Sequence, residues 1–496
     1  MAKAFISKSK YLAGLQCAKL LWTHYNARQL LPAPDASTQA IFDQGHVVGE
    51  LAQSLYPGGV EVTMDRGIDQ TIKDTQALLQ ARKPIFEGSL NYGGVYARAD
   101  VLNPVAGGKW DIIEVKSSTS VKDVNVADLA VQRYCYEGAG LKIRRCYLMH
   151  INRDYVRKGD IDASKLLIAE DVTGIVDERM QEVASEITAM QRTIAKKACP
   201  AVDIGPHCSD PYDCPMTSLC WAHVQKHERN VFTLPRIGGK AWDLYKTGVI
   251  ANSEIPSAFS LGSNQAIQVE AERTETRHVE PVNIAEFLGG LKFPLYLLDF
   301  ETFQAAIPML ENSKPYQQLP FQFSLHVAAD MKAKPKHHAW LWDGDGDPRQ
   351  LMLAELKRLI GPRGSIVSYN AVFEKGIMKT AVESVKSMKP WLKKINSRVV
   401  DLLVPFRKFW VYDPSQLGSA SMKVVLPALT GKSYSDMEIS DGGMASREFL
   451  RVMFTDVDPE ERRRVRSDLE AYCGLDTLGM LDILQALSSM AGRRPR

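Results

Sequence analysis

The amino-acid sequence predicts an α/β protein that is built from more than one domain. The chain has 496 residues, and domains of about 100–200 residues are typical, so two to four domains are expected. Helical and strand patterns alternate in two long blocks, which are separated by a stretch with scattered Gly and Pro residues and a polar run. We therefore predict a first domain over residues 1–228, a connector over 229–284 and a second domain over 285–496.

The composition is that of an ordinary globular protein with little net charge. Lys and Arg number 61 and Asp and Glu number 58, so the formal net charge of +3 excludes a polybasic coat protein and a highly charged disordered chain. Any phosphate-binding site must therefore gather its positive charge locally. The longest apolar stretches, such as residues 293–300, fall well short of the about 20 residues of a membrane span. The N-terminus lacks the pattern of a signal peptide, so we expect a cytoplasmic protein without a membrane partner.

In the first block, a helix comes first and three strands separated by Gly-containing turns follow it. A second helix and a fourth strand continue the pattern, and an amphipathic helix ends it. In chain order, these predicted elements cover residues 37–55, 84–90, 95–102, 110–117, 126–137, 142–151 and 177–197. This order predicts a compact α/β unit with a mixed sheet.

Acidic and basic side chains gather on two neighbouring strands of this unit. Glu114 and Lys116 are two positions apart on one predicted strand, so they share a face, and Asp100 ends the preceding strand. Two carboxylates there could hold a hard divalent cation such as Mg²⁺. The Lys116 ammonium could orient a water or stabilise charge on a phosphate under attack. A solvated strand edge is the alternative interpretation of Glu114 and Lys116 taken alone.

Two predicted helices carry further polar residues at a spacing of four. Gln132 and Tyr136 share one helix face, and His46 and Glu50 share a face of the earlier helix. The order of these residues along the chain, together with Asp100, Glu114 and Lys116, resembles the RecB-like branch of the PD-(D/E)XK nuclease superfamily. The resemblance covers residues 1–228. The resemblance implies a restriction-endonuclease-like fold with three metal ligands and three catalytic residues. The implied ligands are His46, Asp100 and Glu114, and the implied catalytic residues are Lys116, Gln132 and Tyr136.

Three of the eight cysteines are evenly spaced in a proline-containing loop. Cys208, Cys214 and Cys220 could converge on one metal centre, and clustered cysteines in a cytoplasmic chain favour a metal over disulfides. The local sequence supplies no clear fourth ligand, although Cys199 is near. Zinc also suits four thiolates, but the paired Cys-x₂₋₄-Cys knuckles of the usual zinc sites are absent.

Some RecB-like nucleases with an iron–sulfur cluster, including the CRISPR adaptation nucleases, take one cysteine from before the nuclease core and three from after it. Cys17 is similar to that first ligand. The resemblance therefore implies a 4Fe–4S iron–sulfur cluster held by Cys17, Cys208, Cys214 and Cys220, with zinc as the alternative. Its implied role is structural, because it would join the two ends of the domain.

The second block again alternates strands and helices and carries acidic residues at three places. Its predicted strands cover residues 295–299, 321–328, 339–342 and 365–369, with a helix over 348–359 and further helices towards the end. Asp299 and Glu301 share a strand face, and Glu374 opens a helix after a later strand. Tyr472 and Asp476 lie one helical turn apart. Four carboxylates in one place would repel one another unless divalent cations were bound between them.

These positions resemble the three motifs of the DEDD 3′→5′ exonucleases, which have an RNase H-like fold, over residues 285–496. Asp299 and Glu301 match the first motif, Asn370 and Glu374 the second, and Tyr472 and Asp476 the third. The resemblance implies Mg²⁺ or Mn²⁺ bound by Asp299, Glu301, Glu374 and Asp476, with Tyr472 as a catalytic residue. Glu374 stands where the family usually has Asp, and Asp401 is an alternative ligand.

The connector has a helix–turn–helix rhythm around Gly238 and Gly239. It resembles a degenerate helix–hairpin–helix, whose turn offers backbone N–H groups to phosphates. A plain pair of interdomain helices is the alternative.

The order of parts resembles bacterial proteins that fuse an iron–sulfur RecB-like nuclease to an RNase H-like domain. This resemblance implies a metal-dependent nuclease with two active sites that hydrolyses phosphodiester bonds of DNA, or of RNA, in repair, recombination or defence against foreign DNA. A nucleic-acid-binding scaffold with one or both sites inactive is the alternative. The sequence does not identify a helicase or repair partner.

Overall fold

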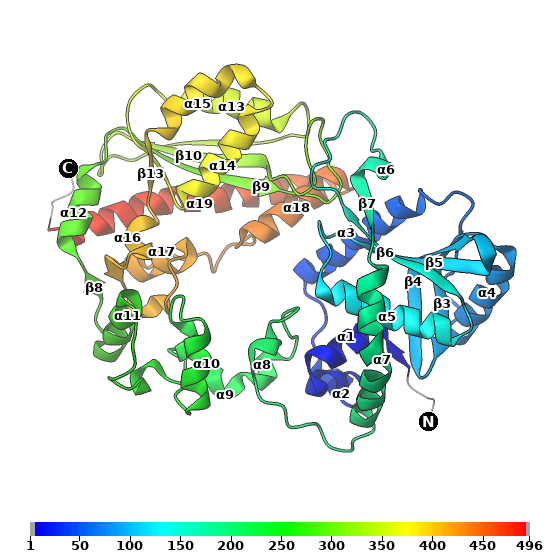
Figure 1. The fold of residues 1–496 in the computed structure, drawn as a ribbon. Helices are drawn as coiled ribbons and strands as arrows, with labels where there is room; N and C mark the ends of the chain where they lie inside the picture. Colours follow the sequence, from blue (N-terminus) through cyan, green and yellow to red (C-terminus); the bar gives the residue numbers. More distant parts are fainter. Residues whose placement is uncertain (1–4, 493–496) are drawn as a thin grey trace. The chain divides into compact units, whose positions relative to one another are not determined.

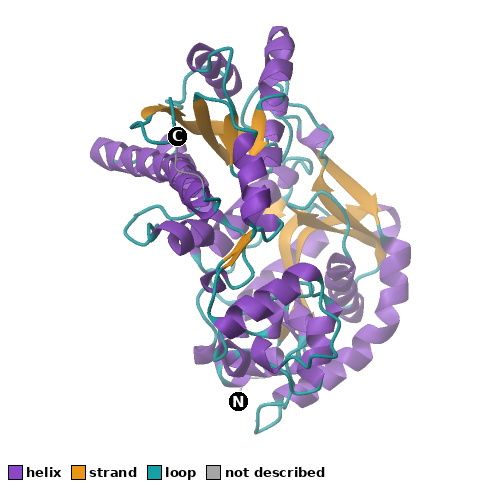
Figure 2. Cartoon of the chain, turned by 90° about the vertical axis from the view of Figure 1, so that its left-hand side faces the viewer, coloured by secondary structure: helices purple, strands orange, loops and turns teal. Residues whose placement is uncertain are grey.

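The computed structural model describes residues 5–492, which form an α/β protein with a seven-stranded and a five-stranded sheet (Figure 1). The chain divides into two compact units. The first contains the residues up to Ala222 together with Ala305–Gln317, and the second contains His223–Gln304 and the chain from Gln318 onwards. The prediction of a multidomain α/β chain is confirmed, and Figure 2 shows its mixture of helices and strands. No helix within the described residues has both the length and the apolar composition needed to cross a bilayer.

A mixed sheet forms the centre of the first unit, in the order β2-β3-β4-β5-β6-β7, with β1 paired to β4. Neighbours β3, β4 and β5 are antiparallel, whereas β5 and β6 run parallel. The strands are β1 (Ile6–Ser7), β2 (Val60–Glu61), β3 (Ile85–Tyr92), β4 (Val95–Val105), β5 (Lys109–Lys116), β6 (Ile143–Ile151) and β7 (Leu167–Asp171). Gly93 and Gly94 have φ of +60° and +85° in the turn between β3 and β4, a conformation that glycine adopts readily.

Helices pack on both faces of this sheet. The helices of this unit are α1 (Lys8–Gln16), α2 (Ala18–Asn26), α3 (Ala36–Gln53), α4 (Ile68–Ala81), α5 (Asp123–Gly138), α6 (Ala163–Leu166), α7 (Thr173–Ile194) and α8 (Thr217–Cys220). Because alternate strand residues face opposite sides, Ile112 of β5 packs with α5 and α7, while Ile113 packs with α3. Glu114 and Lys116 share the face of Ile112 and are therefore directed towards α5.

The second unit contains a five-stranded sheet in the order β11-β10-β9-β12-β13. Neighbours β9, β10 and β11 are antiparallel, whereas β12 is parallel to both β9 and β13. The strands are β9 (Leu295–Phe303), β10 (Leu319–Ala328), β11 (Lys336–Leu341), β12 (Ile366–Ser368) and β13 (Val399–Asp401). A separate pair joins β8 (His278–Val279) to β14 (Val411–Tyr412). The central strand, β9, carries Asp299 and Glu301.

The two faces of this sheet are covered by different helices. Phe300 of β9 shares an apolar cluster with α13, α14 and α15, and the Gln322 amide of β10 donates to the Leu469 carbonyl of α19 at 2.8 Å. The helices are α13 (Pro348–Leu359), α14 (Ala371–Val382), α15 (Lys389–Asn396), α16 (Val404–Arg407), α17 (Met422–Thr430), α18 (Gly442–Phe454) and α19 (Pro459–Met490). Glu301 pairs with Gln322 across the strands, so the acidic side chains of β9 face α19.

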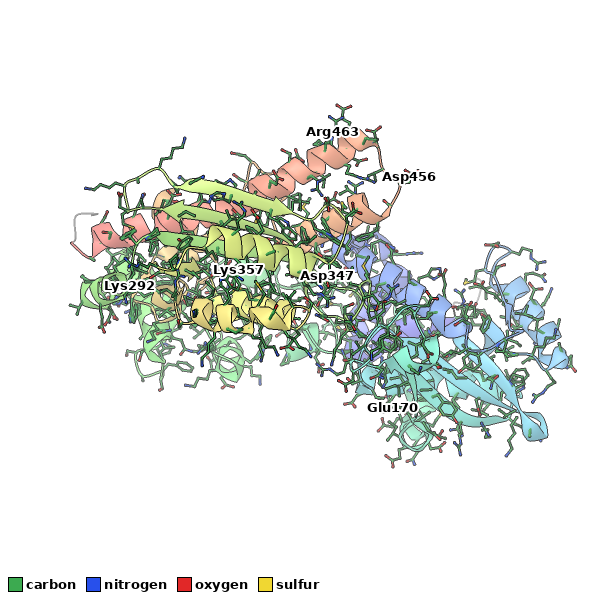
Figure 3. The ribbon with its side chains drawn as sticks, turned by 90° about the horizontal axis from the view of Figure 1, so that it is seen from above. Glu170, Lys292, Asp347, Lys357, Asp456 and Arg463 are labelled. Carbon is green, nitrogen blue, oxygen red and sulfur yellow. The ribbon has the colours of Figure 1, made fainter. Side chains whose placement is uncertain are left out.

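Helix α13 forms over the residues that the sequence predicts, 348–359. Asp347 caps its N-terminus by accepting the Arg349 N–H at 2.9 Å, and Lys357 lies in its last turn (Figure 3). An acid at the start and a base at the end both interact favourably with the helix dipole.

Residues 229–284, which the sequence predicts as a connector, belong to the second unit and have a small apolar core of their own. Helix α9 (Ala222–Gln225) precedes this region, α10 (Gly239–Lys246) and α11 (Ser263–Thr274) lie within it, and α12 (Pro281–Gly289) begins at its end. Ile237, Leu244 and Val269 are buried in this core. The region is therefore folded and is not an extended linker.

The segment Ala305–Gln317 follows β9 in sequence, yet it packs within the first unit. Ala306 is buried in the apolar cluster beside α3. The Arg157 guanidinium donates to the Met309 carbonyl at 2.8 Å, and the Tyr316 hydroxyl donates to the carbonyl of Ser117. The chain therefore leaves the second unit after β9 and returns to it before β10.

Candidate functional site

An acidic cavity of about 640 Å³ lies in the second unit. Residues from β9, from the start of α14, from α17 and from α19 form its wall. Of the residues singled out from the sequence, those that line it are Asp299, Glu301, Asn370, Tyr472 and Asp476. Strand β9 and helix α19 are far apart in sequence, so tertiary packing brings these groups together.

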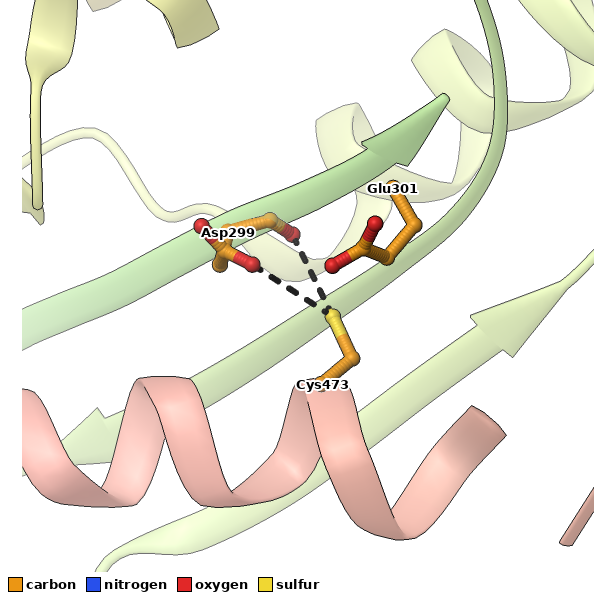
Figure 4. A group of neighbouring side chains, drawn as sticks. All are labelled: Asp299, Glu301 and Cys473. Carbon is orange, nitrogen blue, oxygen red and sulfur yellow. Dashed lines mark hydrogen bonds between the residues drawn. The ribbon is translucent and has the colours of Figure 1, made fainter. Parts of the chain in front are cut away.

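Three potential ligand atoms converge where β9 faces α19. One oxygen each of Asp299 and Glu301 and the sulfur of Cys473 lie within 4.8 Å of one another, and no other described residues form such a group of three (Figure 4). The Cys473 thiol donates to Oδ2 of Asp299 at 3.7 Å. Burial, and next the charge of Asp299, raise the pKa of this thiol well above its ordinary value. Cys473 is therefore a hydrogen-bond donor to Asp299 rather than a thiolate.

The remaining predicted carboxylates flank this group. Glu374 of α14 is buried and hydrogen-bonds Asp299, while its Oε2 atom has no partner among the described residues. Burial, and then the charge of Asp299, raise the pKa of Glu374 to about 9. Asp476 accepts a hydrogen bond from the Tyr434 hydroxyl at 2.5 Å, and burial raises the pKa of Asp476 to about 6. Nearby positive charge is too small to keep these carboxyls ionised, so a divalent cation would stabilise their charged form.

Two basic side chains, Lys423 and Arg407, also line the acidic cavity. The Lys423 ammonium lies 5.7 Å from the centre of the Tyr472 ring and donates to the Ser440 carbonyl at 2.6 Å. Burial, and then the charge of Asp476, raise the pKa of Tyr472, so its phenol stays protonated and can donate a hydrogen bond. The cavity thus combines carboxylates with the phenols of Tyr472 and Tyr369 and with two cationic groups.

Asp401, the alternative ligand, has a structural role at the edge of this cavity. Its Oδ1 atom accepts the backbone N–H groups of Asn370 at 3.1 Å and Leu403 at 3.0 Å. Asn370 has φ of +73°, a left-handed conformation that Asn tolerates better than most residues. Asp401 therefore holds the turn that opens α14, and Glu374 is the side chain that reaches Asp299.

In the first unit, acidic and basic side chains of β4, β5 and α5 share one site. Oδ2 of Asp100 accepts the Val115 N–H at 2.7 Å, and Lys116 donates to Oε1 of Glu114 at 2.6 Å. The Gln132 amide donates to Oε2 of Glu114 at 2.7 Å. The structure therefore brings together Asp100, Glu114, Lys116 and Gln132.

Lys8 and Asp128, which sequence reasoning missed, complete this first-unit site. Lys8, the first residue of α1, donates to Oε1 of Glu114 at 2.8 Å, and its Nζ atom lies 3.7 Å from Oδ1 of Asp100. Asp128 accepts a hydrogen bond from Gln132, four positions further along α5, at 3.1 Å. Helical spacing could have identified Asp128. Nothing in the local sequence marks Lys8, because only tertiary packing places α1 beside β5.

Lysines largely offset the acidic charge of the first-unit site. Burial alone would raise the pKa of Glu114, but the ammonium groups of Lys116 and Lys8 hold it well below its ordinary value. Burial opposes the charged form of Lys116 as well, yet Glu114 and Asp128 raise its pKa. Glu114 is therefore an ionised carboxylate paired with two lysines. Lys8 competes for the place between Asp100 and Glu114 that a divalent cation would take.

The other two predicted residues of the first unit lie apart from this site. His46 has a side chain that is 78% exposed, and its Nε2 atom lies 3.3 Å from Oε1 of Glu50. Helix α3 turns Val48 towards the core, so His46, two residues earlier, points to solvent. Tyr136 is fully buried, and its hydroxyl donates to the Gly88 carbonyl at 2.6 Å, which fixes α5 against β3.

The four predicted cluster ligands line one small cavity in the first unit. They are Cys17, Cys208, Cys214 and Cys220. Leu20 and Met216 pack around them, and no three of the four sulfurs lie within 4.8 Å of one another. Cys199 is exposed and does not line this cavity.

Hydrogen bonds tie the two chain segments of the cysteine cavity together. Cys17 lies between α1 and α2 in an extended conformation, with φ of −160°, so it ends one helix and precedes the next. The Gln16 amide donates to the carbonyls of His207 at 2.9 Å and Tyr212 at 2.7 Å. The loop that carries the other three cysteines is therefore anchored to the end of α1. None of the eight cysteines, all of them described, forms a disulfide.

Comparisons with known proteins find few relatives. A protein-family model described as "Domain of unknown function (DUF2779)" matches residues 296–421, which include Asp299, Glu301 and Glu374. No curated protein matches the chain. One solved structure, described as "Crystal structure of SSO0001", is 13% identical and covers 45% of this chain and 88% of its own chain, with a TM-score of 0.25. A likeness with that TM-score carries no argument about the fold.

Proposed function

We propose that this protein is a metal-dependent nuclease that hydrolyses phosphodiester bonds of nucleic acid, most favourably DNA, in the acidic cavity of its second unit. The observation that carries the proposal is the convergence of Asp299, Glu301 and Asp476 on one cavity, with Glu374 hydrogen-bonded to Asp299. Their raised pKa values make a set of carboxyls that divalent cations would stabilise as carboxylates.

The proposed fold of the second unit is RNase H-like, of the DEDD exonuclease type. Support comes from a five-stranded sheet of three antiparallel strands followed by two strands parallel to the first. Support also comes from the position of Asp299 and Glu301 on its central strand.

In this proposal, the carboxyl, phenol and ammonium groups at the acidic cavity have separate tasks. Asp299, Glu301, Glu374 and Asp476 would hold Mg²⁺ or Mn²⁺, which would neutralise charge at the phosphate and lower the pKa of a bound water. The protonated Tyr472 phenol orients that water by a hydrogen bond, and the Lys423 ammonium neutralises a phosphate oxygen. The water oxygen bonds to phosphorus as the bond to the 3′ oxygen breaks. The proton that the water loses passes to solvent, and the leaving 3′ oxygen takes up a proton from solvent.

The proposed fold of the first unit is that of a RecB-like PD-(D/E)XK nuclease. Support comes from Asp100, Glu114 and Lys116 on adjacent antiparallel strands, with Gln132 of α5 hydrogen-bonded to Glu114. Asp100 and Glu114 would hold the cation, and Lys116 would stabilise the phosphate under attack.

One observation favours a second candidate function for the first unit alone. Lys8 already pairs with Glu114 and approaches Asp100, so a cation must displace an ammonium group to bind there. A first unit that binds nucleic acid without cutting it is therefore the alternative. The two candidates differ in whether the first unit cuts a strand when the second is disabled.

The cysteine cavity is proposed to hold a 4Fe–4S cluster with a structural role. Four thiols from before and after the sheet line one apolar cavity, which fits a ligand set for a metal centre. Tetrahedral zinc is the alternative, but the usual zinc sites use paired Cys-x₂₋₄-Cys knuckles, and Cys208, Cys214 and Cys220 are each six positions apart. This sequence spacing favours the larger cluster.

The proposed function is tested by incubating the protein, purified without oxygen, with end-labelled single- and double-stranded DNA and RNA. Mg²⁺ and Mn²⁺ are compared with EDTA. We expect cation-dependent shortening of labelled DNA. Intact substrates under all of these conditions would exclude a nuclease and favour a binding scaffold.

A further inference from the structure

A second cavity, of about 330 Å³, shares a wall with the acidic cavity of the second unit. Arg407 and Ala420 line both cavities. Arg236 and the first residues of α11 line the second cavity, and its wall contains no acidic side chain. We refer to it as the arginine cavity, after Arg236 and Arg407.

The two arginines leave this cavity with uncompensated positive charge. Arg236 and Arg407 are both exposed, and no side-chain hydrogen bond or ion pair joins either guanidinium to a described residue. The neighbouring acidic cavity instead contains Asp299, Glu301 and Asp476. A cavity lined by carboxyl groups thus shares a wall with a cavity lined by two arginines.

Hydrogen bonds hold the walls of the arginine cavity in place. The Asn264 amide donates to the carbonyl of Arg407 at 3.1 Å, and the Gln265 amide donates to the carbonyl of Pro235 at 3.0 Å. Both donors lie in the first turn of α11, so one helix fixes the two segments that carry the arginines. Arg236 and Arg407 therefore face a preformed cavity.

We propose that the arginine cavity binds a backbone phosphate of the strand whose end occupies the acidic cavity. The inference rests on the proposed function, because it gives the path of the substrate through the same site. Guanidinium groups pair with phosphate through two parallel hydrogen bonds, and positively charged grooves bind single strands along their backbone. Arg407, on the shared wall, contacts the phosphate between the cavities, and Arg236 contacts the next one. The preferred substrate is therefore a strand several nucleotides long.

The test compares wild type, Arg236→Glu and a control, Arg363→Glu, on two substrates. Arg363 is exposed and lines neither cavity. The short substrate is the p-nitrophenyl ester of thymidine 5′-phosphate, and the long one is a twelve-nucleotide DNA strand. We expect the KM of the strand divided by the KM of the ester to rise at least about tenfold in Arg236→Glu only. The slope of log affinity against log salt should also fall by about 0.7 for each phosphate that the variant no longer neutralises.

The outcomes separate this inference from the proposed function. If the ester is hydrolysed but the KM ratio and the salt slope are unchanged in Arg236→Glu, the arginine cavity is not a phosphate site and the nuclease stands. If wild type hydrolyses neither substrate, the nuclease proposal fails. Fluorescence anisotropy of the labelled strand then tests the cavity directly, because equal binding by Arg236→Glu and Arg363→Glu would overturn it.

Discussion

The ammonium group of Lys8 lies 2.8 Å from Oε1 of Glu114 in the first unit. Lys8 begins α1, and Cys17 directly follows the last residue of this helix, so one helix links the first-unit site to the cysteine cavity. The place beside Glu114 and Asp100 is the one that a divalent cation would occupy in the proposed nuclease. Lys8 and the cation therefore compete for the same carboxylate charge.

Replacement of Lys8 by Met tests this competition. We expect Lys8→Met to lower the free energy of unfolding by about 1–3 kcal/mol in EDTA, because a buried carboxylate loses one partner. Mg²⁺ should then raise the Tm of Lys8→Met more than that of wild type, since the competing ammonium is gone. Thermal unfolding over a series of Mg²⁺ concentrations measures both effects. Lys73→Met, at an exposed position of α4, is the control, and equal Mg²⁺-dependent shifts in all three proteins would refute the competition.

The raised pKa of Glu374 predicts how stability depends on pH. Its pKa is about 9 in the folded chain, against an ordinary value of 4.5. A carboxyl whose pKa is raised on folding stabilises the folded state at low pH, and this contribution is lost as pH rises through the folded pKa. In EDTA, the Tm should therefore fall from about pH 5 to about pH 9. Glu374→Gln, which cannot ionise, should flatten this fall.

The control for this pH series is Glu383→Gln, because Glu383 is exposed and its pKa is lowered, first by its hydrogen bond to Lys389. It should keep the wild-type slope above pH 6. Parallel pH profiles for wild type and Glu374→Gln would show that Glu374 is not the titrating group.

The cysteine cavity predicts a difference between two cysteine variants. Cys17→Ser removes a thiol that lines the cavity, so we expect loss of most bound iron, of brown colour and of several degrees of Tm. Cys199→Ser changes an exposed thiol outside the cavity and should keep the iron content and Tm of wild type. Elemental analysis and thermal unfolding measure these quantities. If the wild-type protein contains one zinc and no iron, the cavity holds zinc and the proposal of an iron–sulfur cluster is wrong.

Lys116 decides whether the first unit cuts nucleic acid. The reporter protein carries Asp299→Ala, so that the second-unit cavity is disabled. In that background, Lys116→Ala should lower the rate of strand cleavage by about 10²–10³-fold, because the phosphate under attack loses its cationic partner. Lys109→Ala, at the exposed start of the same strand, should leave the rate of strand cleavage unchanged. If the Asp299→Ala parent itself does not cut, the first unit is a binding module.

Short-range periodicity explains what the sequence could predict. Residues two apart on a strand share a face, which is sufficient to pair Glu114 with Lys116 and Asp299 with Glu301. The i,i+4 spacing of a helix also identifies His46 and Glu50 as neighbours. It does not say which side of the helix faces the core, and α3 turns His46 outward.

Tertiary packing accounts for what the sequence could not predict. Lys8 reaches Glu114 from a helix more than a hundred positions away, and Cys473 reaches Asp299 because α19 crosses β9. The i,i+3 spacing from Cys473 to Asp476 was a usable sign that both share a helix face. No sequence pattern marks the passage of Ala305–Gln317 into the first unit. There, Ala306, Ile307 and Tyr316 pack in one apolar cluster, and backbone carbonyls accept hydrogen bonds.

Mn²⁺-dependent release of nucleotides from a 3′-labelled DNA strand shows directly whether the acidic cavity hydrolyses nucleic acid. The parent protein carries Lys116→Ala, so that any cleavage measured comes from the second unit. Asp299→Ala in this parent should lower the rate at least about 10²-fold, because Asp299 contacts both Glu374 and Cys473 at the centre of the cavity. Asp456→Ala, an exposed residue outside the cavity (Figure 3), should digest the strand like the parent. Equal rates for Asp299→Ala and the parent would show that the acidic cavity does not hydrolyse nucleic acid.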